Sequence, residues 1–335
     1  MVGKTGTWKA RGAGMARRMG PLRSVIGLLA IFSAGVLFGY DERLGKNIFL
    51  DPGNLTDILR QVSEIGIIAL AMTFVIITAG IDLSVGSMLA LSASVTAALL
   101  TQWSPALAPT PHILVAMAGA VALCGALGAV NGAVIAFFRM QPFIVTLAAM
   151  IGVRGLAKWL TRNENIDVGF GDDVGALFAR TLSSKPLVIT IFIVLAVIFA
   201  FILARTIAGR YIRAVGDNQQ AARYAGLPIR RVQIFVYTLS GLMAGLAGVV
   251  HCAQNHQGSP NTGMAYELEA IAAVVIGGTS LAGGRGAVTG TIVGTLIMGI
   301  LTNIFRLNNV DSNVEMMVKA VIIIAAVRLQ QRRVR

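Results

Sequence analysis

Residues that commonly bind metals or form disulfides are scarce in this sequence, which has two cysteines and three histidines among 335 residues. Cys124 and Cys252 each lie inside an apolar run. The histidines lack the i, i+4 spacing of a metal site on a helix, and no acidic side chains complement them in the sequence. The pattern therefore indicates neither a disulfide framework nor a metal centre.

Charged residues are also scarce, at 13% of the chain, whereas apolar residues make up 56%. Soluble domains carry a charged fraction of about 25%, so the composition predicts an integral membrane protein. Basic residues outnumber acidic ones by 28 to 15, and they cluster at the two ends and between residues 205 and 231. Such clustering is typical of loops retained in the cytoplasm, and it does not indicate a nucleic-acid partner.

A complete nucleotide-binding motif is missing as well. Gly3, Lys4 and Thr5 resemble the end of a phosphate-binding loop, but only two residues precede Gly3, so G-x-x-x-x-G-K-[ST] lacks its first glycine. Because no catalytic constellation is present either, we expect a chain that is not an enzyme and holds no cofactor of its own.

Long apolar runs dominate the rest of the chain. Counting runs of about 20 residues predicts about ten transmembrane helices, at 22–40, 58–80, 83–100, 112–138, 143–160, 186–204, 232–253, 266–282, 287–305 and 314–328. The first run could belong to a signal peptide, but it is longer than an ordinary h-region and no cleavage site follows, so we expect a retained span. The predicted fold is an all-α polytopic membrane protein, with one transmembrane domain at 22–328 between basic tails at 1–21 and 329–335.

Three charge clusters predict one orientation. Basic residues hold both ends in the cytoplasm, which requires an even number of spans. The same count places residues 205–231, here called the basic island, inside the cell. It places outside the loop whose acidic residues are Glu164, Asp167, Asp172 and Asp173.

The basic island contains a short predicted helix. Asp217 or Asn218 can cap its start, and Gly226 followed by Pro228 ends it after about two turns. A helix of this length is marginal in water, so we expect a partner to cover its small face. That face consists of Ala221, Ala222 and Ala225. An amphipathic loop lying on lipid headgroups is the alternative.

Two glycine-rich breaks, Thr78–Ser87 and Gly277–Gly290, separate apolar runs. Such segments are expected where helices break or turn inside protein-covered membrane, and both breaks are predicted to lie at the cytoplasmic ends of their spans. Asp82 can cap the next helix or contact a substrate, and its predicted place near the membrane surface favours capping. The predicted gate or pathway residues of the two breaks are Gly80, Asp82, Ser84, Gly86, Gly277, Gly278, Gly283 and Gly284.

Two amides complete the set of candidate pathway residues. Asn131 lies near the end of the fourth span, before a short turn at Arg139. Asn303 lies inside the ninth span, where its amide must find a partner. That partner is a neighbouring helix or a hydroxyl of the transported solute, and helix bonding is the preferred interpretation.

Four segments together resemble a known family. They are MTFVIITAGIDLSVGSMLALS (72–92), NGAVIAFFRMQPFIVTLA (131–148), GRYIRAVGDNQQAARYAGLPIRRVQIFVYTLSGLMAGLAG (209–248) and YELEAIAAVVIGGTSLAGGRGAVTGTIVG (266–294). In this order they resemble the permease subunit of ribose-type sugar ABC importers, from about residue 50 to 328. The resemblance implies a bacterial inner-membrane permease that pairs with a second permease subunit. It also implies a cytoplasmic ATPase that binds ATP and Mg²⁺, and a periplasmic protein that delivers a monosaccharide.

Within this resemblance, the basic island corresponds to the family's coupling segment. The positions that fall on its G-x-N-x-x-A-A-x-x-x-G pattern are Gly216, Asn218, Ala221, Ala222 and Gly226. Asp217 stands where the family often has glycine, Arg162 and Asn163 replace a small-residue turn, and Ile304 replaces a glycine after Asn303. These departures leave the identity of the sugar open.

Two other functions fit parts of the pattern. An ion-coupled secondary transporter would also show broken helices and repeated halves, and residues 73–100 loosely resemble 270–301 in their apolar, glycine-break, apolar order. The basic island and the lack of suitable carboxylates within the spans argue against it. A membrane scaffold without transport activity is the third reading.

Overall fold

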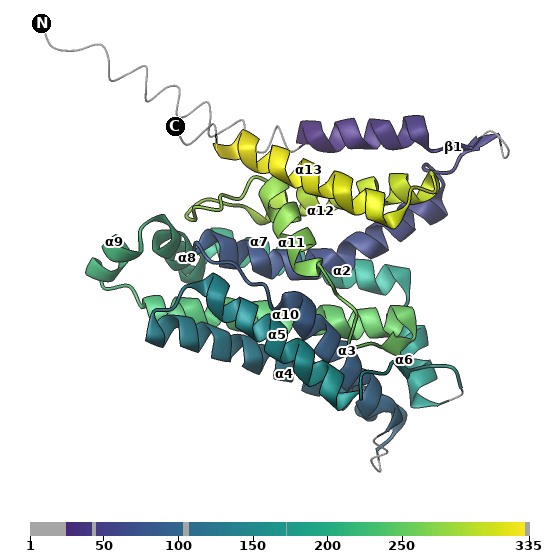
Figure 1. Cartoon of the computed structure of the whole chain (residues 1–335), viewed down its shortest axis with the longest axis horizontal. Helices are drawn as coiled ribbons and strands as arrows, with labels where there is room; N and C mark the ends of the chain where they lie inside the picture. The colour runs from purple at the N-terminus through teal and green to yellow at the C-terminus, as the bar shows by residue number, and fades with distance from the viewer. Residues whose placement is uncertain (1–24, 42–44, 103–106, 172, 332–335) are drawn as a thin grey trace, which may run out of the picture.

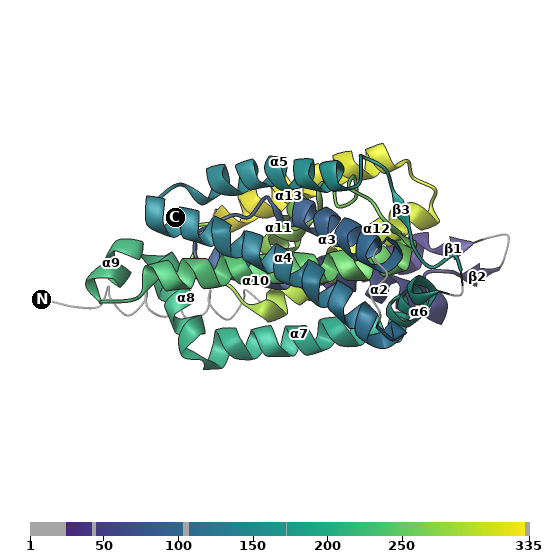
Figure 2. The same ribbon diagram turned by 90° about the horizontal axis from the view of Figure 1, so that it is seen from below.

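The computed structural model describes residues 25–41, 45–102, 107–171 and 173–331. Within these ranges nearly all regular structure is helical, and the helices lie side by side in one bundle (Figures 1 and 2). Six of the helices in the described ranges are long and apolar enough to cross a membrane. They are α2 (Pro52–Ile77), α4 (Pro109–Phe138), α5 (Pro142–Leu160), α7 (Lys185–Arg205), α10 (Ile229–Asn255) and α12 (Val288–Leu307). The fold class predicted from the sequence is thereby confirmed.

Helix starts follow local sequence signals. Proline occupies the first turn of α2, α4, α5 and α7, where its missing N–H costs no hydrogen bond. At α2, the side chain of Asp51 accepts a hydrogen bond from the N–H of Gly53 at 2.8 Å. The apolar run then extends to Ile77, where the first break begins.

Burial separates a central helix from peripheral ones. In α2, 83% of the most apolar window is buried, against 28% in α4, 28% in α7 and 22% in α5. The exposed side chains of α7 include Ile193, Val197 and Phe201. Because such an apolar surface is unfavourable in water, these outer faces are suited to lipid. α10 lies against α4 at close range, since a Cβ at Gly128 would overlap the carbonyl of Tyr237.

Shorter elements fill the remaining positions. The shorter apolar helices are Val25–Phe38 and α3 (Val85–Thr101). α11 (Tyr266–Ile276) and α13 (Ser312–Gln331) complete the bundle near the C-terminus. The amphipathic or short helices are α6 (Val174–Leu182), α8 (Ile207–Asp217) and α9 (Gln219–Tyr224). Two-residue strands pair as β1 (Tyr40–Asp41) with β2 (Lys46–Asn47), and as β3 (Ile166–Asp167) with β4 (Gln257–Gly258).

The bundle has two distinct ends. α8 and α9 lie at one end, on the left of Figure 1, and α6 with the β1–β2 hairpin lies at the other. The acidic loop pairs through β3 with β4, directly after α10, so it lies at the end away from α9. The predicted separation of the acidic loop from the basic island is therefore observed, although Asp172 lies outside the described residues.

Each of the ten predicted spans overlaps a described helix, but only the six helices named above are long and apolar enough to cross a membrane. The span predicted at 266–282 departs most. α11 has 11 residues, about 16 Å at 1.5 Å per residue, roughly half of a bilayer core. Residues 259–265, which precede α11, lie beside α3, with Gly258 against Ala93 and Gly263 against Gly86. The sequence did not show where the helix stops, because glycines continue the run after Ile276 and glycine occurs both in membrane helices and in turns.

The predicted tails are only partly described. Residues 1–21 lie outside the described ranges, and α13 continues through Gln331, beyond the predicted span end at 328. The helix Val25–Phe38 and α13 run in opposite directions, since Asn308, just before α13, donates to the carbonyl of Phe38 at 3.2 Å. The helix Val25–Phe38 therefore begins, and α13 ends, toward the end of the bundle that carries α8 and α9 (Figure 1).

Candidate functional site

The two glycine-rich breaks meet the basic island at one place, here called the junction and formed by Ile77–Gly80, Gly216–Asp217 and Gly283–Gly284. The N–H of Gly284 donates to the carbonyl of Ile77 at 2.9 Å. A Cβ at Gly216 would overlap that same carbonyl oxygen. Three segments far apart in the sequence thus touch through their backbones.

Backbone geometry explains the glycines of the second break. Gly278, Gly283 and Gly284 have φ of 92°, 86° and 73°, a region that disfavours other residues. A Cβ at Gly283 would also meet the carbonyl of Gly216, and one at Gly277 would overlap the carbonyl of Gly290. This break is therefore a set of tight turns that holds α11 against α12.

The first break is constrained by space rather than by φ. A Cβ at Gly80 would overlap the hydroxyl of Tyr237 on α10, and one at Gly86 would overlap the carbonyl of Gly263. The strained backbone in this break belongs to Ala79, with φ of 60°. Gly80 is thus needed for close packing against α10.

Asp82 and Ser84 are enclosed by the protein. Asp82 is fully buried, and its Oδ1 accepts from the N–H and the hydroxyl of Ser84 at 3.0 and 2.6 Å. Asn131 donates to the hydroxyl of Ser84 at 3.1 Å, from a position seven residues, or about 10 Å, before α4 ends. Ser84 is the residue before α3 and makes no capping hydrogen bond itself, so Asp82 orders the helix start from outside the helix.

The short helix of the basic island is confirmed as α9. Asn218 caps it by accepting from the N–H of Ala221 at 2.9 Å, and Gly226 follows it with φ of 74°. The predicted small face is wrong in one respect, because Ala222 is 4% exposed and packs into the chain's own core. Tyr224, at 91% exposure, is the large side chain that α9 presents outward.

The sequence did not predict α8, which precedes α9. Thr206 caps it by accepting from the N–H of Gly209 at 3.3 Å, and its buried side includes Ile212 and Val215. Its final turn carries Gly216 into the junction. The alternation of arginines with apolar residues at helical spacing was the signal available for it.

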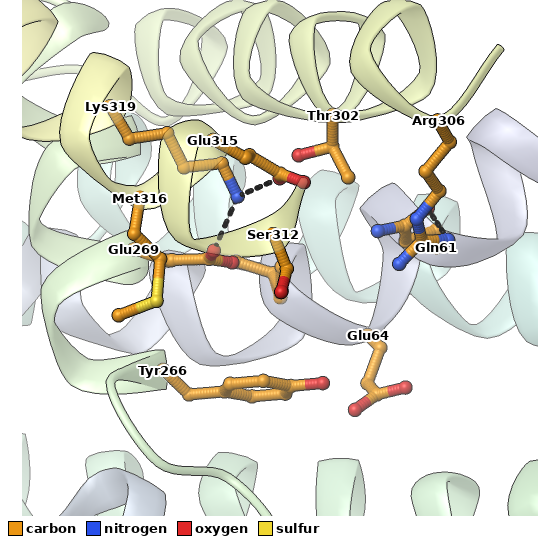
Figure 3. A pocket seen from close by; sticks show the side chains of 11 residues that line it. Gln61, Glu64, Tyr266, Glu269, Thr302, Arg306, Ser312, Glu315, Met316 and Lys319 are labelled. Atoms are coloured by element: carbon orange, nitrogen blue, oxygen red, sulfur yellow. Dashed lines mark hydrogen bonds and ion pairs between the residues drawn. The ribbon is translucent and has the colours of Figure 1, made fainter. Parts of the chain in front are cut away.

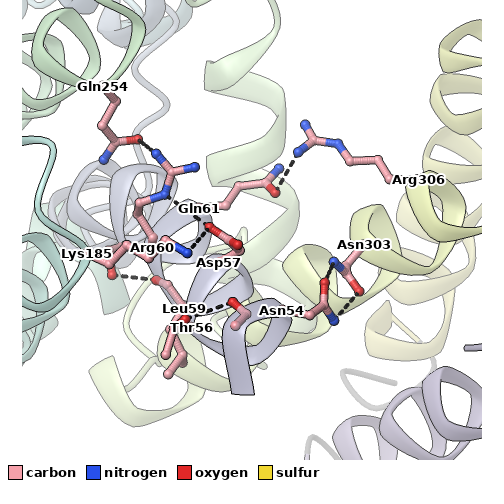
Figure 4. A network of polar contacts seen from close by, with 12 residues as sticks. Asn54, Thr56, Asp57, Leu59, Arg60, Gln61, Lys185, Gln254, Asn303 and Arg306 are labelled. Carbon is pink, nitrogen blue, oxygen red and sulfur yellow. Dashed lines mark hydrogen bonds and ion pairs between the residues drawn. The ribbon is translucent and has the colours of Figure 1, made fainter. Parts of the chain in front are cut away.

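Asn303 lies away from the junction, toward the opposite end. Its amide forms a reciprocal pair with Asn54 of α2, with N···O distances of 2.7 and 3.2 Å (Figure 4). Bonding between helices was the preferred interpretation, and the structure confirms it.

Further polar contacts surround this amide pair. Asp57 pairs with Lys185 at 3.0 Å, and Arg306 donates to Gln61 at 3.1 Å (Figure 4). The end of the bundle that bears α6 is therefore held by side chains on α2, α7 and α12.

A polar cavity of about 200 Å³ opens beside this network. Its walls come from α2, α11, α12 and α13 (Figure 3). The lining residues are Gln61, Glu64, Ile65, Tyr266, Glu269, Thr302, Arg306, Ser312, Glu315, Met316 and Lys319. This set is here called the polar cavity.

Ion pairs order the cavity wall. Lys319 lies between Glu269 and Glu315, at 2.7 Å from a carboxylate oxygen of each (Figure 3). Glu64 contacts Nδ1 of His251 at 2.6 Å, and Thr262 contacts the other ring nitrogen. The sequence showed no acidic complement for His251, because Glu64 lies 187 residues away in the chain.

Comparisons with known proteins agree with this architecture. Residues 54–327 match the family described as "Branched-chain amino acid transport system / permease component". The chain is 41% identical to the ribose import permease protein RbsC of Escherichia coli (strain K12) over 93% of its length and 94% of the relative's. It is 40% identical to RbsC of Bacillus subtilis (strain 168), over 96% of this chain and 94% of that one.

A third relative bears a different name. The chain is 37% identical to the D-allose transport system permease protein AlsC of Escherichia coli (strain K12), over 91% of this chain and 90% of the relative. No solved structure matches the chain. The matched residues cover both breaks, the basic island and the polar cavity, and the chain therefore belongs to this family of transport-system permease components.

Proposed function

We propose that this chain is the membrane-spanning permease subunit of an ATP-driven importer of a monosaccharide. The junction is the observation that carries this proposal, because it connects the exposed helix α9 to both breaks through backbone contacts. A movement of α8 and α9 cannot leave Ile77 or Gly284 in place, since no side chain lies between these segments to absorb it.

ATP hydrolysis belongs to a separate ATPase subunit, which binds ATP and Mg²⁺ and docks on α9. Tyr224 supplies a large exposed side chain for this contact, surrounded by Ala221 and Arg223 on the outward side of the helix. The ends of the chain then lie in the cytoplasm together with α8 and α9, as the basic residues of the island require.

The solute is a sugar rather than a branched-chain amino acid. The relatives are named for ribose and D-allose import or transport, and nine of the eleven residues that line the cavity carry a polar or charged group, with Ile65 and Met316 as the exceptions. These groups can form hydrogen bonds with sugar hydroxyls, which a branched aliphatic side chain cannot do. A binding protein outside the membrane delivers the sugar to the end of the bundle away from α9.

A second permease subunit, either a copy of this chain or a related chain, completes the translocation route. The polar cavity opens to the surface beside the exposed residues Ser312 and Met316, so a single chain does not enclose it. Membership of the family of transport-system permease components argues against an ion-coupled secondary transporter and against a scaffold.

The test uses the permease reconstituted in proteoliposomes with its ATPase and binding protein. Tyr224→Asp should abolish co-purification of the ATPase and lower ATP-dependent sugar uptake at least about tenfold, a loss of about 1.4 kcal/mol in coupling. Phe170→Asp is the matched control, because Phe170 is 79% exposed at the other end of the bundle, and it should retain the ATPase. Sugar uptake driven by an ion gradient, without ATP, would overturn the proposal.

A further inference from the structure

The polar cavity has the composition of a small-solute site. We propose that it binds the monosaccharide on its way into the membrane, with Tyr266, Glu269 and Lys319 as its contact residues. This inference rests on the proposed function, because it assumes that the transported solute is a sugar. Neither the family description nor the relatives' names assign a site to these residues.

Hydrogen-bonding groups of both kinds converge on the cavity. Glu64, Glu269 and Glu315 supply carboxylate oxygens, which accept hydrogen bonds from hydroxyl groups. Lys319 has three N–H donors, and its contacts with Glu269 and Glu315 use two of them. A sugar hydroxyl both donates and accepts, so it can bridge the ammonium and a carboxylate at the same time.

The aromatic ring of Tyr266 supplies an apolar wall. It lies on the side of the cavity opposite α12, with its hydroxyl directed toward Glu64 (Figure 3). Aromatic side chains combine a flat apolar face with a polar tip, which matches the apolar C–H face and polar rim of a pyranose or furanose. The ring of His251 lies edge-to-face with it, with the two centroids 6.1 Å apart and an interplanar angle of 87°.

The size of the cavity suits a small solute. Its volume of about 200 Å³ is smaller than the range of about 300–1,000 Å³ of ordinary ligand pockets. A second, water-sized cavity shares Gln61, Glu269 and Thr302 with it, and Thr295 adds a hydroxyl one to two turns nearer the junction along α12. The other residues that it adds are Val62, Met298 and Gly299, so the lining becomes more apolar further inward.

α11 connects the cavity to the junction. Tyr266 and Glu269 lie in its first turn, and Gly277 directly follows its last residue. A sugar that displaces Glu269 from Lys319 would act on a half-helix about 16 Å long, whose far end leads into the turns at Gly283 and Gly284. Occupation of the site is thereby linked to the backbone contacts that the ATPase moves.

The test measures uptake by the complete transporter, with its ATPase and binding protein in proteoliposomes. The probes are radiolabelled D-ribose, D-allose, L-arabinose and D-fructose, chosen because relatives are named for these sugars. Tyr266→Leu removes the ring and should lower uptake of the transported sugar about tenfold to a hundredfold. Tyr266→Phe keeps the ring and should change the ranking of the four sugars while losing less uptake.

Exchange of the ion pair separates binding from structure. The triple variant Glu269→Lys, Glu315→Lys and Lys319→Glu inverts all three charges and keeps opposite charges in contact, so it should co-purify with the ATPase as the wild type does. Its uptake should nevertheless stay at least about tenfold reduced, because donor and acceptor have changed places. Trp159→Leu is the control, since this aromatic residue is 75% exposed on α5, away from the cavity, and it should leave uptake unchanged.

Three outcomes overturn the inference. Wild-type uptake of all four sugars by Tyr266→Leu would show that the ring contacts no solute. Full uptake by the charge-exchanged variant would show that the ion pairs serve only the fold. Loss of ATPase co-purification in Tyr266→Leu would show that the ring of Tyr266 serves only the fold. Failure of the proposed function looks different, because the wild-type transporter would then take up none of the four sugars with ATP.

Discussion

The two ends of the bundle are built in different ways. At the α8–α9 end, Gly216, Ile77 and Gly284 meet backbone to backbone, with no side chain between them. At the other end, α2, α11, α12 and α13 meet through long charged side chains around a cavity. A backbone contact transmits displacement with little slack, whereas flexible charged side chains can exchange a partner in the protein for a solute. The first arrangement suits force transmission, and the second suits reversible binding.

Among the substitutions that test this difference between the two ends, those at Gly216 should have the largest effect. Any Cβ there overlaps the carbonyl of Ile77, so Gly216→Val should destabilise the permease by more than about 4 kcal/mol, through overpacking of a rigid contact. We expect little monodisperse protein after detergent extraction, measured by fluorescence-detected size exclusion. Gly152→Val on α5 is the control, because a Cβ at Gly152 meets nothing within 4 Å. Equal yields of the two variants would show that the junction is not tightly packed.

Gly284, another glycine of the junction, should respond to a smaller change. Gly284 has φ of 73°, so even Gly284→Ala forces an unfavourable backbone, at a cost of about 1–2 kcal/mol. Gly80 lacks this strain and is limited by the hydroxyl of Tyr237. Gly80→Ala in a Tyr237→Phe background should therefore recover part of the uptake that Gly80→Ala loses. If Tyr237→Phe gives no recovery, the steric account of Gly80 is wrong.

The next prediction concerns how α9 is held. Ala222 is buried against the chain's own core, whereas Ala221 is exposed. Ala222→Glu should detach α9 and lower both uptake and sugar-stimulated ATP hydrolysis by at least about tenfold, because an unpaired carboxylate is costly to bury. The permease should still insert, as judged by its yield in membranes.

Position 221 provides the comparison for that variant. Ala221→Glu alters only the outward face of α9, so its loss should appear as weaker ATPase binding with an unchanged thermal stability. If Ala222→Glu retains full uptake, α9 does not transmit motion through the inner face described here.

Local signals in the sequence were enough to predict most helices and α9, but not the contacts between segments. The residues that begin and end α9 could be recognised from the sequence, because Asn218, Gly226 and Pro228 lie within a dozen residues. Glu64 and His251 are separated by 187 residues, and their contact exists only after α2 and α10 pack. The junction is of the same kind, because glycine content predicted turns but not which carbonyl each turn approaches.

Apolar runs were also an incomplete guide to where helices end and to which polar groups are buried. They predicted a full span at 266–282, although the helix ends at Ile276, and they did not show that Asp82 is fully buried within the protein. In both cases an extended segment is covered by neighbouring helices that supply its hydrogen bonds. Hydropathy measures what a residue prefers, and it cannot show that Ser84 and Asn131 will enclose Asp82.

At the cavity end, the amide pair of Asn54 and Asn303 should have a modest effect. Asn303→Leu leaves Asn54 with its bond to the carbonyl of Phe49 but without its amide partner, which should cost about 1 kcal/mol, typical of hydrogen bonds between membrane helices. The double variant with Asn54→Leu should recover part of this loss, because no amide is left unpaired. Thermal unfolding in detergent provides the measurement. If Asn303→Leu loses most of its uptake while its stability falls by only about 1 kcal/mol, Asn303 contributes to transport and not only to helix packing.

The smallest expected effect on transport comes from single cysteines that report which end of the bundle faces which side. Gln219 on α9 and Glu164 in the acidic loop are both exposed, and they lie at opposite ends. The native Cys124 and Cys252 are fully buried, so background labelling should be low. A membrane-impermeant thiol reagent added to intact cells should label Glu164→Cys, and it should label Gln219→Cys only after the membrane is opened, because short arginine-rich loops resist translocation. Labelling of Gln219→Cys from outside would place the polar cavity on the cytoplasmic side and remove α9 from reach of an ATPase. The contrast between the two ends would then still describe the fold, but its mechanical and binding roles would have to be reversed.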